Sequence, residues 1–313
     1  MWPLSRTGFP KQFLCFTGNE SLFQQAAQRL AAFGNESIQI AAPVIVSGEE
    51  HRFMASEQLR EVGILLGTAL LEPIGRNTAP ALTLATFAAV QNGQDPVLVV
   101  TPADQTIATP AAFTTAVQQA IAQAEKGNIV ILGVTPDKPE TGYSYIKVAL
   151  HCEKCSDPAL QPMTVEAFVE KPNLPTAWRY LSEGGYYWNA GMFVLKASFW
   201  LAAIEQFAPV ILQTTRTAWD ARKTDGTFVR PGKAEFEAIP SESVDYAVME
   251  HRPGSAFPIQ MVHSMLAGAT WKLGMPSGKC SRKTHTATPL WATYCKPTAT
   301  TPWSTPAAAW WRW

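Results

Sequence analysis

The sequence lacks the features that would draw the chain into a membrane or onto nucleic acid. Its 313 residues include 25 Lys and Arg against 25 Asp and Glu, so the formal net charge is zero. A neutral chain has no general electrostatic attraction to nucleic acid. No apolar run approaches the roughly 18 to 20 residues of a membrane span, and residues 1–13 contain no apolar core of the kind that a signal peptide needs. We therefore expect a soluble globular protein that binds neither nucleic acid nor membrane.

Cysteine is also scarce, and its pattern excludes two kinds of structural support. The chain has five cysteines, an odd number that suits a reducing cytoplasm better than a disulfide framework. Cys152 and Cys155 form one CxxC motif beside His151, but no second pair stands at zinc-binding spacing. We expect no metal site there.

The end of the chain lacks acidic residues altogether. Residues 263–313 contain no Asp or Glu in 51 positions, yet they carry six Trp, nine Thr and five Pro. All 25 acidic residues therefore lie in residues 1–262, which have an ordinary, mildly acidic composition. This break divides the chain into a body, 1–262, and an aberrant tail, 263–313.

One stretch of the body, PVLVVTPADQ at residues 96–105, combines a strand with a carboxylate at its end. Four apolar residues, 97–100, stand between Pro96 and Pro102, which is typical of a strand buried on both faces of a largely parallel sheet. Asp104 follows at the carboxyl end, where open α/β sheets bind ligands. An Asp there either holds a divalent cation against a phosphate, or starts a turn or caps the next helix. The spacing alone leaves both open.

Strands and helices alternate along the rest of the body. The clearest helix is 109–126, with Thr109 as its cap, Pro110 in its first turn and Gly127 at its end. The predicted strands are 39–46, 64–71, 97–100, 128–133, 146–148, 165–169 and 194–195, and the other predicted helices are 22–31, 49–60, 79–91, 174–182, 199–207, 210–222 and 244–250. Phe53 and Leu59 are expected to face inward from the helix at 49–60, and Ser243 is expected to cap the helix at 244–250. This alternation predicts an α/β fold with a mostly parallel mixed sheet and helices on both faces.

Ten short motifs stand in order along the body. They are WPLSR at 2–6, PKQFL at 10–14, EEHRF at 49–53, QLRE at 58–61, GRNTAPA at 75–81, PAD at 102–104, ETGYSYI at 140–146, FVEKP at 168–172, WNAGMF at 188–193 and SVDYAVME at 243–250. Together they resemble the bacterial mannose-1-phosphate guanylyltransferases, the GDP-mannose pyrophosphorylases. The resemblance implies a Rossmann-like nucleotidyltransferase (GT-A-like) domain over residues 1–262.

The resemblance also implies the reaction. An oxygen of mannose 1-phosphate attacks the α-phosphorus of GTP in line, diphosphate leaves, and the GDP-mannose product feeds polysaccharide synthesis. The protein supplies no covalent nucleophile; it positions two anions and offsets their repulsion. This chemistry calls for cations, backbone donors and a Mg²⁺ ion held by carboxylate and phosphate oxygens.

On the nucleotide side, the resemblance assigns roles to five residues. Asp104 would hold Mg²⁺, and Arg6 and Lys11 would face the triphosphate. Arg76 and Asn77 would lie near the nucleotide. Taken alone, Lys11 reads as a solvated surface lysine, and the pair at 76–77 as a surface cation followed by a helix cap.

On the sugar side, the resemblance assigns another five. Gly142 would let the backbone approach the hexose, although a plain turn also explains it. Glu170 and Lys171 would bind a sugar hydroxyl and the sugar phosphate, although as a bare pair they read as an ion pair at a strand end. Asn189 and Gly191 would complete the sugar pocket.

Three neighbouring residues are interpreted differently. Trp188 and Phe193 are expected to pack rather than bind. Ser144 stands where the family usually has glycine, so the sugar is expected to fit less well.

The sequence departs from the family at its start. The family begins with an apolar strand and a glycine-rich loop, roughly GGxGTR, just before LWPLSR, whereas this chain starts at Met1-Trp2-Pro3, inside that signature. The loop would supply backbone N–H groups to the phosphates. The strand would be central, so without it two sheet edges are expected to stay unpaired.

The second departure is the tail. After Val262 the family continues approximately as PLDAGWSDLGAWDAVW, which supplies another aspartate to the metal. Regrouping codons permitted for residues from His263 onward gives LDAGWSDLEAWDAVWQVLAEDAHGN in a shifted frame. We therefore interpret residues 263–313 as out-of-frame translation and expect a largely unstructured tail. The alternative is a Trp/Thr/Pro-rich interaction arm or a segment that binds nucleic acid through cations and aromatic rings.

These departures lead us to expect little or no activity from this polypeptide. Two other functions stay open: a sugar-phosphate nucleotidyltransferase with a different base or hexose, and a non-catalytic remnant that binds sugar phosphate. The family often continues into a phosphomannose isomerase domain, which this chain does not reach, so no isomerase activity is expected. The sequence leaves the oligomeric state open, a homo-oligomer included.

Overall fold

The computed structural model describes residues 8–16, 18–107, 109–149, 161–251 and 257–264, together with the backbone of two strands at 290–297 and 310–312. The α-helices are α1 (Leu22–Ala31), α2 (Arg52–Glu61), α3 (Thr78–Ala89), α4 (Pro110–Glu125), α5 (Leu174–Glu183), α6 (Ala197–Phe207), α7 (Pro209–Asp220), α8 (Lys233–Glu237) and α9 (Val244–Ala247), with short 3₁₀ turns η1 (Lys11–Phe13), η2 (Glu49–His51) and η4 (Met249–His251). The strands are β1 (Ile38–Ile40), β2 (Val44–Gly48), β3 (Thr68–Glu72), β4 (Val97–Pro102), β5 (Ile129–Val134), β6 (Tyr145–Val148), β7 (Met163–Val169), β8 (Tyr186–Lys196), β9 (Lys223–Asp225), β10 (Phe228–Arg230), β11 (Ile259–His263), β12 (Leu290–Pro297) and β13 (Trp310–Arg312).

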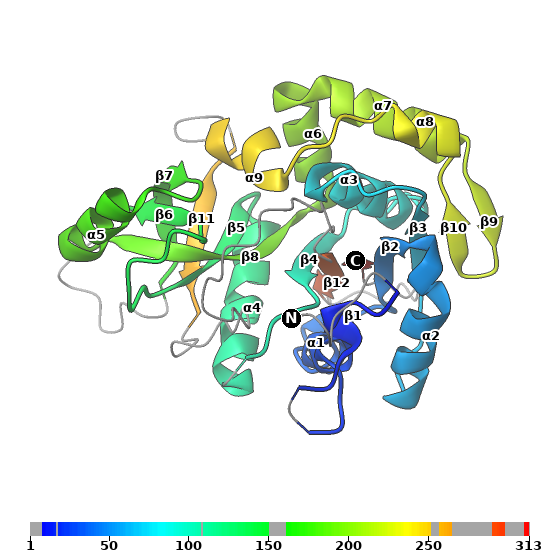
Figure 1. The fold of residues 1–313 in the computed structure, drawn as a ribbon, viewed down its shortest axis with the longest axis horizontal. Coiled ribbons are helices and arrows are strands. Elements are labelled where there is room, and N and C mark those ends of the chain that lie inside the picture. Colours follow the sequence, from blue (N-terminus) through cyan, green and yellow to red (C-terminus); the bar gives the residue numbers. More distant parts are fainter. Residues whose placement is uncertain are drawn as a thin grey trace.

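The described strands form one mixed sheet in the order β5-β11-β7-β6-β8-β4-β12-β13-β2-β3-β10-β9, with β1 beside β12 (Figure 1). Following the pairings, all described strands run in one direction except β7, β8, β9 and β12. The α/β mixed sheet is thus confirmed. "Mostly parallel" holds for strand direction, but the reversed strands β7, β8 and β12 lie between strands of the opposite direction, so most hydrogen-bonded neighbours are antiparallel.

Helices cover both faces of the sheet, and the sequence pattern of the central strands explains why. In β4, Leu98 and Val100 belong to the core beneath α3, α6 and α7, whereas Val97 and Val99 belong to the core beneath α1 and α4. Successive side chains on a strand point to opposite faces, so a continuous apolar run serves two cores at once. Figure 1 shows α3, α6 and α7 on one side of the sheet and α1, α2 and α4 on the other.

Two predicted strands are shorter than expected, for identifiable reasons. The strand predicted at 39–46 is divided into β1 and β2 by Pro43, which has no N–H to donate to a ladder. The strand predicted at 64–71 begins only at Thr68. Gly67 passes so close to the residues just before β2 that a Cβ atom there would lie 2.8 Å from the Pro43 carbonyl oxygen. Leu65, in the part that is not a strand, is 83% exposed.

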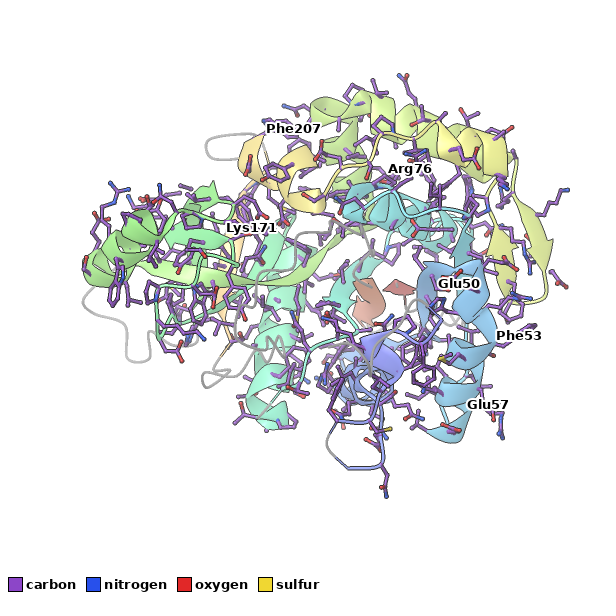
Figure 2. All side chains as sticks on the ribbon, viewed as in Figure 1. Glu50, Phe53, Glu57, Arg76, Lys171 and Phe207 are labelled. Atoms are coloured by element: carbon purple, nitrogen blue, oxygen red, sulfur yellow. The ribbon has the colours of Figure 1, made fainter. Side chains whose placement is uncertain are left out.

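The interpretation of α2 needs one correction. Leu59 is buried as expected, but Phe53, predicted to face inward, is 65% exposed. Its ring lies against Phe228 in an edge-on contact, with the Arg52 guanidinium 4.1 Å from the ring centroid. Figure 2 shows Phe53 on the outer side of α2, near the β9–β10 hairpin. Phe53 therefore joins α2 to the hairpin rather than to the core.

Two segments of the predicted tail, β12 and β13, form strands. β12 runs antiparallel between β4 and β2, with Tyr294 opposite Leu98 and Trp291 opposite Ile45, and β13 pairs with β2 in parallel. These segments become strands because the edges of β2 and β4 offer backbone N–H and C=O groups that need partners. The predicted boundary at 262 also falls inside β11, and Ser264 donates to the Gly133 carbonyl oxygen. The out-of-frame interpretation stays a prediction.

Some predicted features fall outside the described residues, among them Arg6 and the CxxC motif at Cys152 and Cys155. Within the described part of the chain, no helix combines the length and apolar character needed to cross a membrane.

Candidate active site

A cavity of about 250 Å³ opens beside the carboxyl end of β4. It lies where β8, the loop after β7 and the start of α9 approach β4. Seven of the ten predicted site residues line it: Lys11, Asp104, Gly142, Glu170, Lys171, Asn189 and Gly191. Segments up to 180 residues apart in sequence (from Lys11 to Gly191) therefore meet at one place.

At one end of the cavity, Lys11 and Asp104 form an ion pair. Asp104 stands two residues beyond β4 with 5% of its side chain exposed, and Lys11, in η1, is 30% exposed. Helix α4 begins only at Pro110, so Asp104 does not cap it. The predicted cap, Thr109, makes no capping hydrogen bond to α4 either.

Two partly buried hydrogen bonds fix the loop that carries Asp104. The Gln105 amide Nε2 donates to the Ala190 carbonyl oxygen at 2.8 Å, and Arg29 Nη2 donates to the Gln105 carbonyl oxygen at 2.9 Å. Burial lowers the pKa of Arg29 to about 10, which leaves it charged at neutral pH. The loop is thus tied both to β8 and to α1.

At the other end, Glu170 is the centre of a polar cluster. Its side chain is 7% exposed; one oxygen accepts from the Ser144 hydroxyl and the other pairs with the Lys171 ammonium. Lys171 has a φ of 42°, in the left-handed region that non-glycine residues seldom adopt. Burial lowers the pKa of Lys171, but the hydrogen bond and charge of Glu170 outweigh it, and the net shift is upward.

Asn189 is held in one orientation by its neighbours. Its Oδ1 accepts from the Gly191 backbone N–H at 2.8 Å, which turns Nδ2 toward Asp245, where it donates to Oδ1 at 3.1 Å. Gly191 has a φ of 69°, so glycine is required by conformation there. Gly142 has no such requirement; its N–H donates to Glu140 Oε1 at 3.1 Å and closes the turn.

Asp245 is the residue that sequence reasoning missed. It lies in the first turn of α9, lines the cavity, and has a pKa raised to about 7 by burial and then by the negative charge of Glu170. The motif SVDYAVME contained it, but Ser243 followed by an acidic first turn is explained by helix capping alone. That cap is real, since Ser243 Oγ accepts from Tyr246 N at 3.1 Å. Thr78, Gln105, Ser144 and Trp188 also line the cavity, the last in addition to its predicted packing role.

Arg76 and Asn77 are not part of the cavity wall. Arg76 donates to the Glu237 carbonyl oxygen, and Asn77 caps α3 by accepting from Thr78 N at 2.9 Å. Figure 2 places Arg76 near α3 and α8, away from Lys171. The next residue, Thr78, is the one that reaches the cavity, and its Oγ1 accepts from Val244 N at 2.8 Å.

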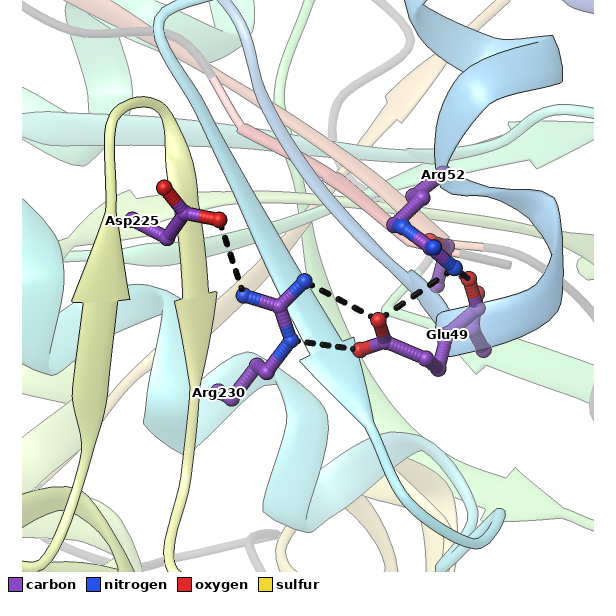
Figure 3. A network of polar contacts seen from close by, with 6 residues as sticks. Glu49, Arg52, Asp225 and Arg230 are labelled. Carbon is purple, nitrogen blue, oxygen red and sulfur yellow. Dashed lines mark hydrogen bonds and ion pairs between the residues drawn. The ribbon is translucent and has the colours of Figure 1, made fainter.

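A second polar network lies at the same sheet edge but serves another purpose. Glu49, directly after β2, receives two hydrogen bonds from Arg230, at 2.9 and 3.0 Å, and a third contact from Arg52 at 3.3 Å. Asp225 lies 3.7 Å from Arg230 on the facing strand of the hairpin (Figure 3). A bidentate Arg–carboxylate pair is rigid, so the network fastens the β9–β10 hairpin to α2.

The described residues contain no cluster of three or more His, Cys, Asp or Glu that could hold a metal ion. Asp104 nevertheless suits Mg²⁺, because this ion commonly takes one or two carboxylates from the protein and completes its shell with phosphate oxygens and water.

Comparison with known proteins defines the class. Residues 1–276 match the family model described as "Nucleotidyl transferase", and the chain belongs to that family. This confirms the nucleotidyltransferase class that the ten motifs predicted.

Among its relatives, the chain is 46% identical over 250 residues to the xanthan biosynthesis protein XanB of Xanthomonas campestris pv. campestris. The aligned region covers 80% of this chain and 51% of that protein. It is 42% identical over 252 residues to the mannose-1-phosphate guanylyltransferase of Escherichia coli (strain K12), with 80% and 51% covered. The chain thus spans about half the length of these curated relatives. A solved structure described as mannose-6-phosphate isomerase from Helicobacter pylori shares 31% identity at a TM-score of 0.71, covering 84% of this chain and 95% of that one.

Proposed function

We propose that this chain binds GTP and mannose 1-phosphate and joins them into GDP-mannose and diphosphate for polysaccharide biosynthesis. The observation that carries the proposal is the arrangement of the cavity wall. A cation and a carboxylate, Lys11 and Asp104, stand at one end, and a carboxylate, a cation and an oriented amide, Glu170, Lys171 and Asn189, stand at the other. The relatives named as guanylyltransferases support the choice of base and hexose.

In the proposed reaction, a phosphate oxygen of mannose 1-phosphate forms a bond to the α-phosphorus of GTP. The bond from that phosphorus to the β-phosphate bridging oxygen breaks, and its electron pair leaves with diphosphate. The chain's own task is to hold the two anions in line and offset their charge. Lys171 would turn from Glu170 to the sugar phosphate, and Lys11 would face the triphosphate.

The sugar end of the cavity provides both kinds of hydrogen-bonding group. Glu170 accepts, and Asn189 carries a donor and an acceptor on one fixed amide. The Ser144 hydroxyl, at a position where the family usually has glycine, donates to one carboxylate oxygen of Glu170, the residue predicted to bind a sugar hydroxyl. We expect this contact to weaken mannose binding.

Mg²⁺ would be held by Asp104 together with substrate phosphates and water. It would neutralise charge on the phosphates as diphosphate departs. Lys11 would then share Asp104 with the ion. The odd number of cysteines and the nucleotide substrates support a cytoplasmic setting for this reaction.

Purified protein incubated with GTP, mannose 1-phosphate and Mg²⁺ tests the proposal by release of diphosphate. We expect the low turnover predicted from the sequence, and we expect K171M to reduce it at least tenfold, because a hydrogen bond to a charged partner contributes about 1.5 to 3 kcal/mol. The matched control is K126M, which removes a lysine at the end of α4, away from the cavity wall. Binding of mannose 1-phosphate without turnover would instead establish a non-catalytic sugar-phosphate-binding protein.

A further inference from the structure

Asp245 is a carboxylate of the cavity wall that has no role in the proposed transfer reaction described above. It lines the cavity beside Glu170, Lys171 and Asn189, and it comes from α9, an element that contributes no other wall residue.

The position of Asp245 is fixed by contacts between α9 and α3. Val244 N donates to Thr78 Oγ1 at 2.8 Å, and Ala79 N donates to the Glu242 carbonyl oxygen at 3.0 Å. Both bonds join the start of α3 to the backbone at the start of α9, at Val244 and at Glu242 just before the helix. Asp245 therefore follows directly on backbone that is anchored to α3.

Asn189 orients the carboxylate itself. Because Gly191 N–H takes the Asn189 Oδ1, the amide nitrogen must face Asp245, and it donates to Oδ1. A carboxylate has two oxygens that each accept hydrogen bonds. The second oxygen of Asp245 thus has a defined place on the wall.

Two carboxylates converge on this end of the cavity. The negative charges of Asp245 and Glu170 repel each other, and the positive charge of the Lys171 ammonium, which pairs with Glu170, offsets part of this repulsion. A phosphate would be repelled by two carboxylates, whereas hydroxyl groups would donate to both. Acceptors that come from different elements, the β7–α5 loop and α9, meet hydroxyls only in certain relative positions on a ring.

We propose that Asp245 is a specificity-determining residue that accepts a hydrogen bond from one ring hydroxyl of the hexose 1-phosphate while Glu170 accepts from another. The cavity thereby distinguishes hexose epimers, whose hydroxyls differ in direction. This inference rests on the proposed function, since it needs a hexose 1-phosphate in the cavity.

Calorimetric binding of mannose 1-phosphate, glucose 1-phosphate and GTP, each alone at pH 8, tests the inference on the full chain. D245N keeps the shape of the side chain and its hydrogen-bonding capacity toward Asn189 while removing the charge. We expect D245N to bind mannose 1-phosphate about 10 to 100 times more weakly, to lose most of the preference over glucose 1-phosphate, and to bind GTP within twofold of the unchanged chain. D220N, on the exposed end of α7, is the matched control and should change none of the three.

The outcomes separate the two proposals. If the unchanged chain binds neither sugar phosphate, the proposed function and this inference are both wrong. If it binds mannose 1-phosphate and D245N binds it equally well, or if D245N weakens both sugars by the same factor, only the inference is wrong. Should D245N fail to fold, D245E keeps the charge and displaces it by one methylene; unchanged preference between the epimers in D245E would overturn the inference.

Discussion

The ion pair between Lys11 and Asp104 gives a direct test of how the cavity is built. Replacing Lys11 by Met keeps the apolar stem and removes the charge, which leaves Asp104 buried without its partner. Breaking a fully buried pair costs about 3 to 5 kcal/mol. Lys11 is 30% exposed, so water compensates part of this loss, and we expect K11M to lower the free energy of unfolding by about 2 kcal/mol.

The double variant distinguishes pairing from packing. K11M/D104N removes both charges, so its free energy of unfolding should lie within about 1 kcal/mol of that of the unchanged chain. The two substitutions would then show a favourable coupling energy. Urea unfolding at pH 7.5 measures all three. The exposed pair Glu57–Arg60, 2.6 Å apart on α2, is the control, and E57Q should change little and less still in 1 M salt. A stable K11M, or a double variant less stable than both single variants, would refute the reasoning.

Three further predictions concern stability. The pKa of Asp245 is raised to about 7 by burial and by Glu170, so between about pH 4 and pH 7 the folded state keeps a proton that the unfolded state releases, and the stability contributed by this group falls as the pH rises. In urea unfolding across this range, the free energy of unfolding of D245N should rise by up to about 4 kcal/mol relative to that of the unchanged chain. Parallel curves of stability against pH for the two proteins would contradict this. T83V should lower the free energy of unfolding by about 1 to 3 kcal/mol, because the buried indole N–H of Trp200 donates to Thr83 Oγ1 at 3.1 Å, whereas T86V, whose hydroxyl bonds to the Leu82 carbonyl oxygen, should cost less; equal losses in thermal unfolding would count against the indole contact. Ending the chain after residue 289 removes β12 and β13 and should lower the urea midpoint more than ending it after 297, which keeps β12; two equal midpoints would show that β12 does not support the sheet.

The sequence predicted the parts of the fold whose pattern is local. The unbroken apolar run in β4 indicated burial on both faces, and Ser243 was correctly predicted to cap α9. Boundaries set by tertiary contacts were harder: the start of β3 depends on how closely Gly67 passes β2, which no local pattern reveals. The strands at β12 and β13 were missed because an acid-free, Trp- and Thr-rich composition says nothing about edges elsewhere that need partners.

In the candidate site, too, residues with a local sequence pattern were predicted, and a residue placed by tertiary contacts was missed. Seven of the ten residues that the motifs predicted line one cavity, which lies where the carboxyl end of β4 meets the middle of β8, the start of β6 and the end of β7. Asn77 belongs to a motif as well, but its side chain is used up in capping α3, and its neighbour Thr78 reaches the cavity instead. Asp245 could not be found from spacing, because its position depends on α9 docking against α3 through Thr78.

The central claim is that this cavity transfers guanylyl to mannose 1-phosphate, and a competition experiment tests it most directly. The purified chain is given equimolar GTP, ATP, UTP and CTP with equimolar mannose 1-phosphate and glucose 1-phosphate and Mg²⁺, and the nucleotide sugars formed are identified by mass spectrometry. We predict GDP-mannose as the main product, and its loss in D104N. A different nucleotide sugar as the main product, or the same product in undiminished amount from D104N, would contradict the account.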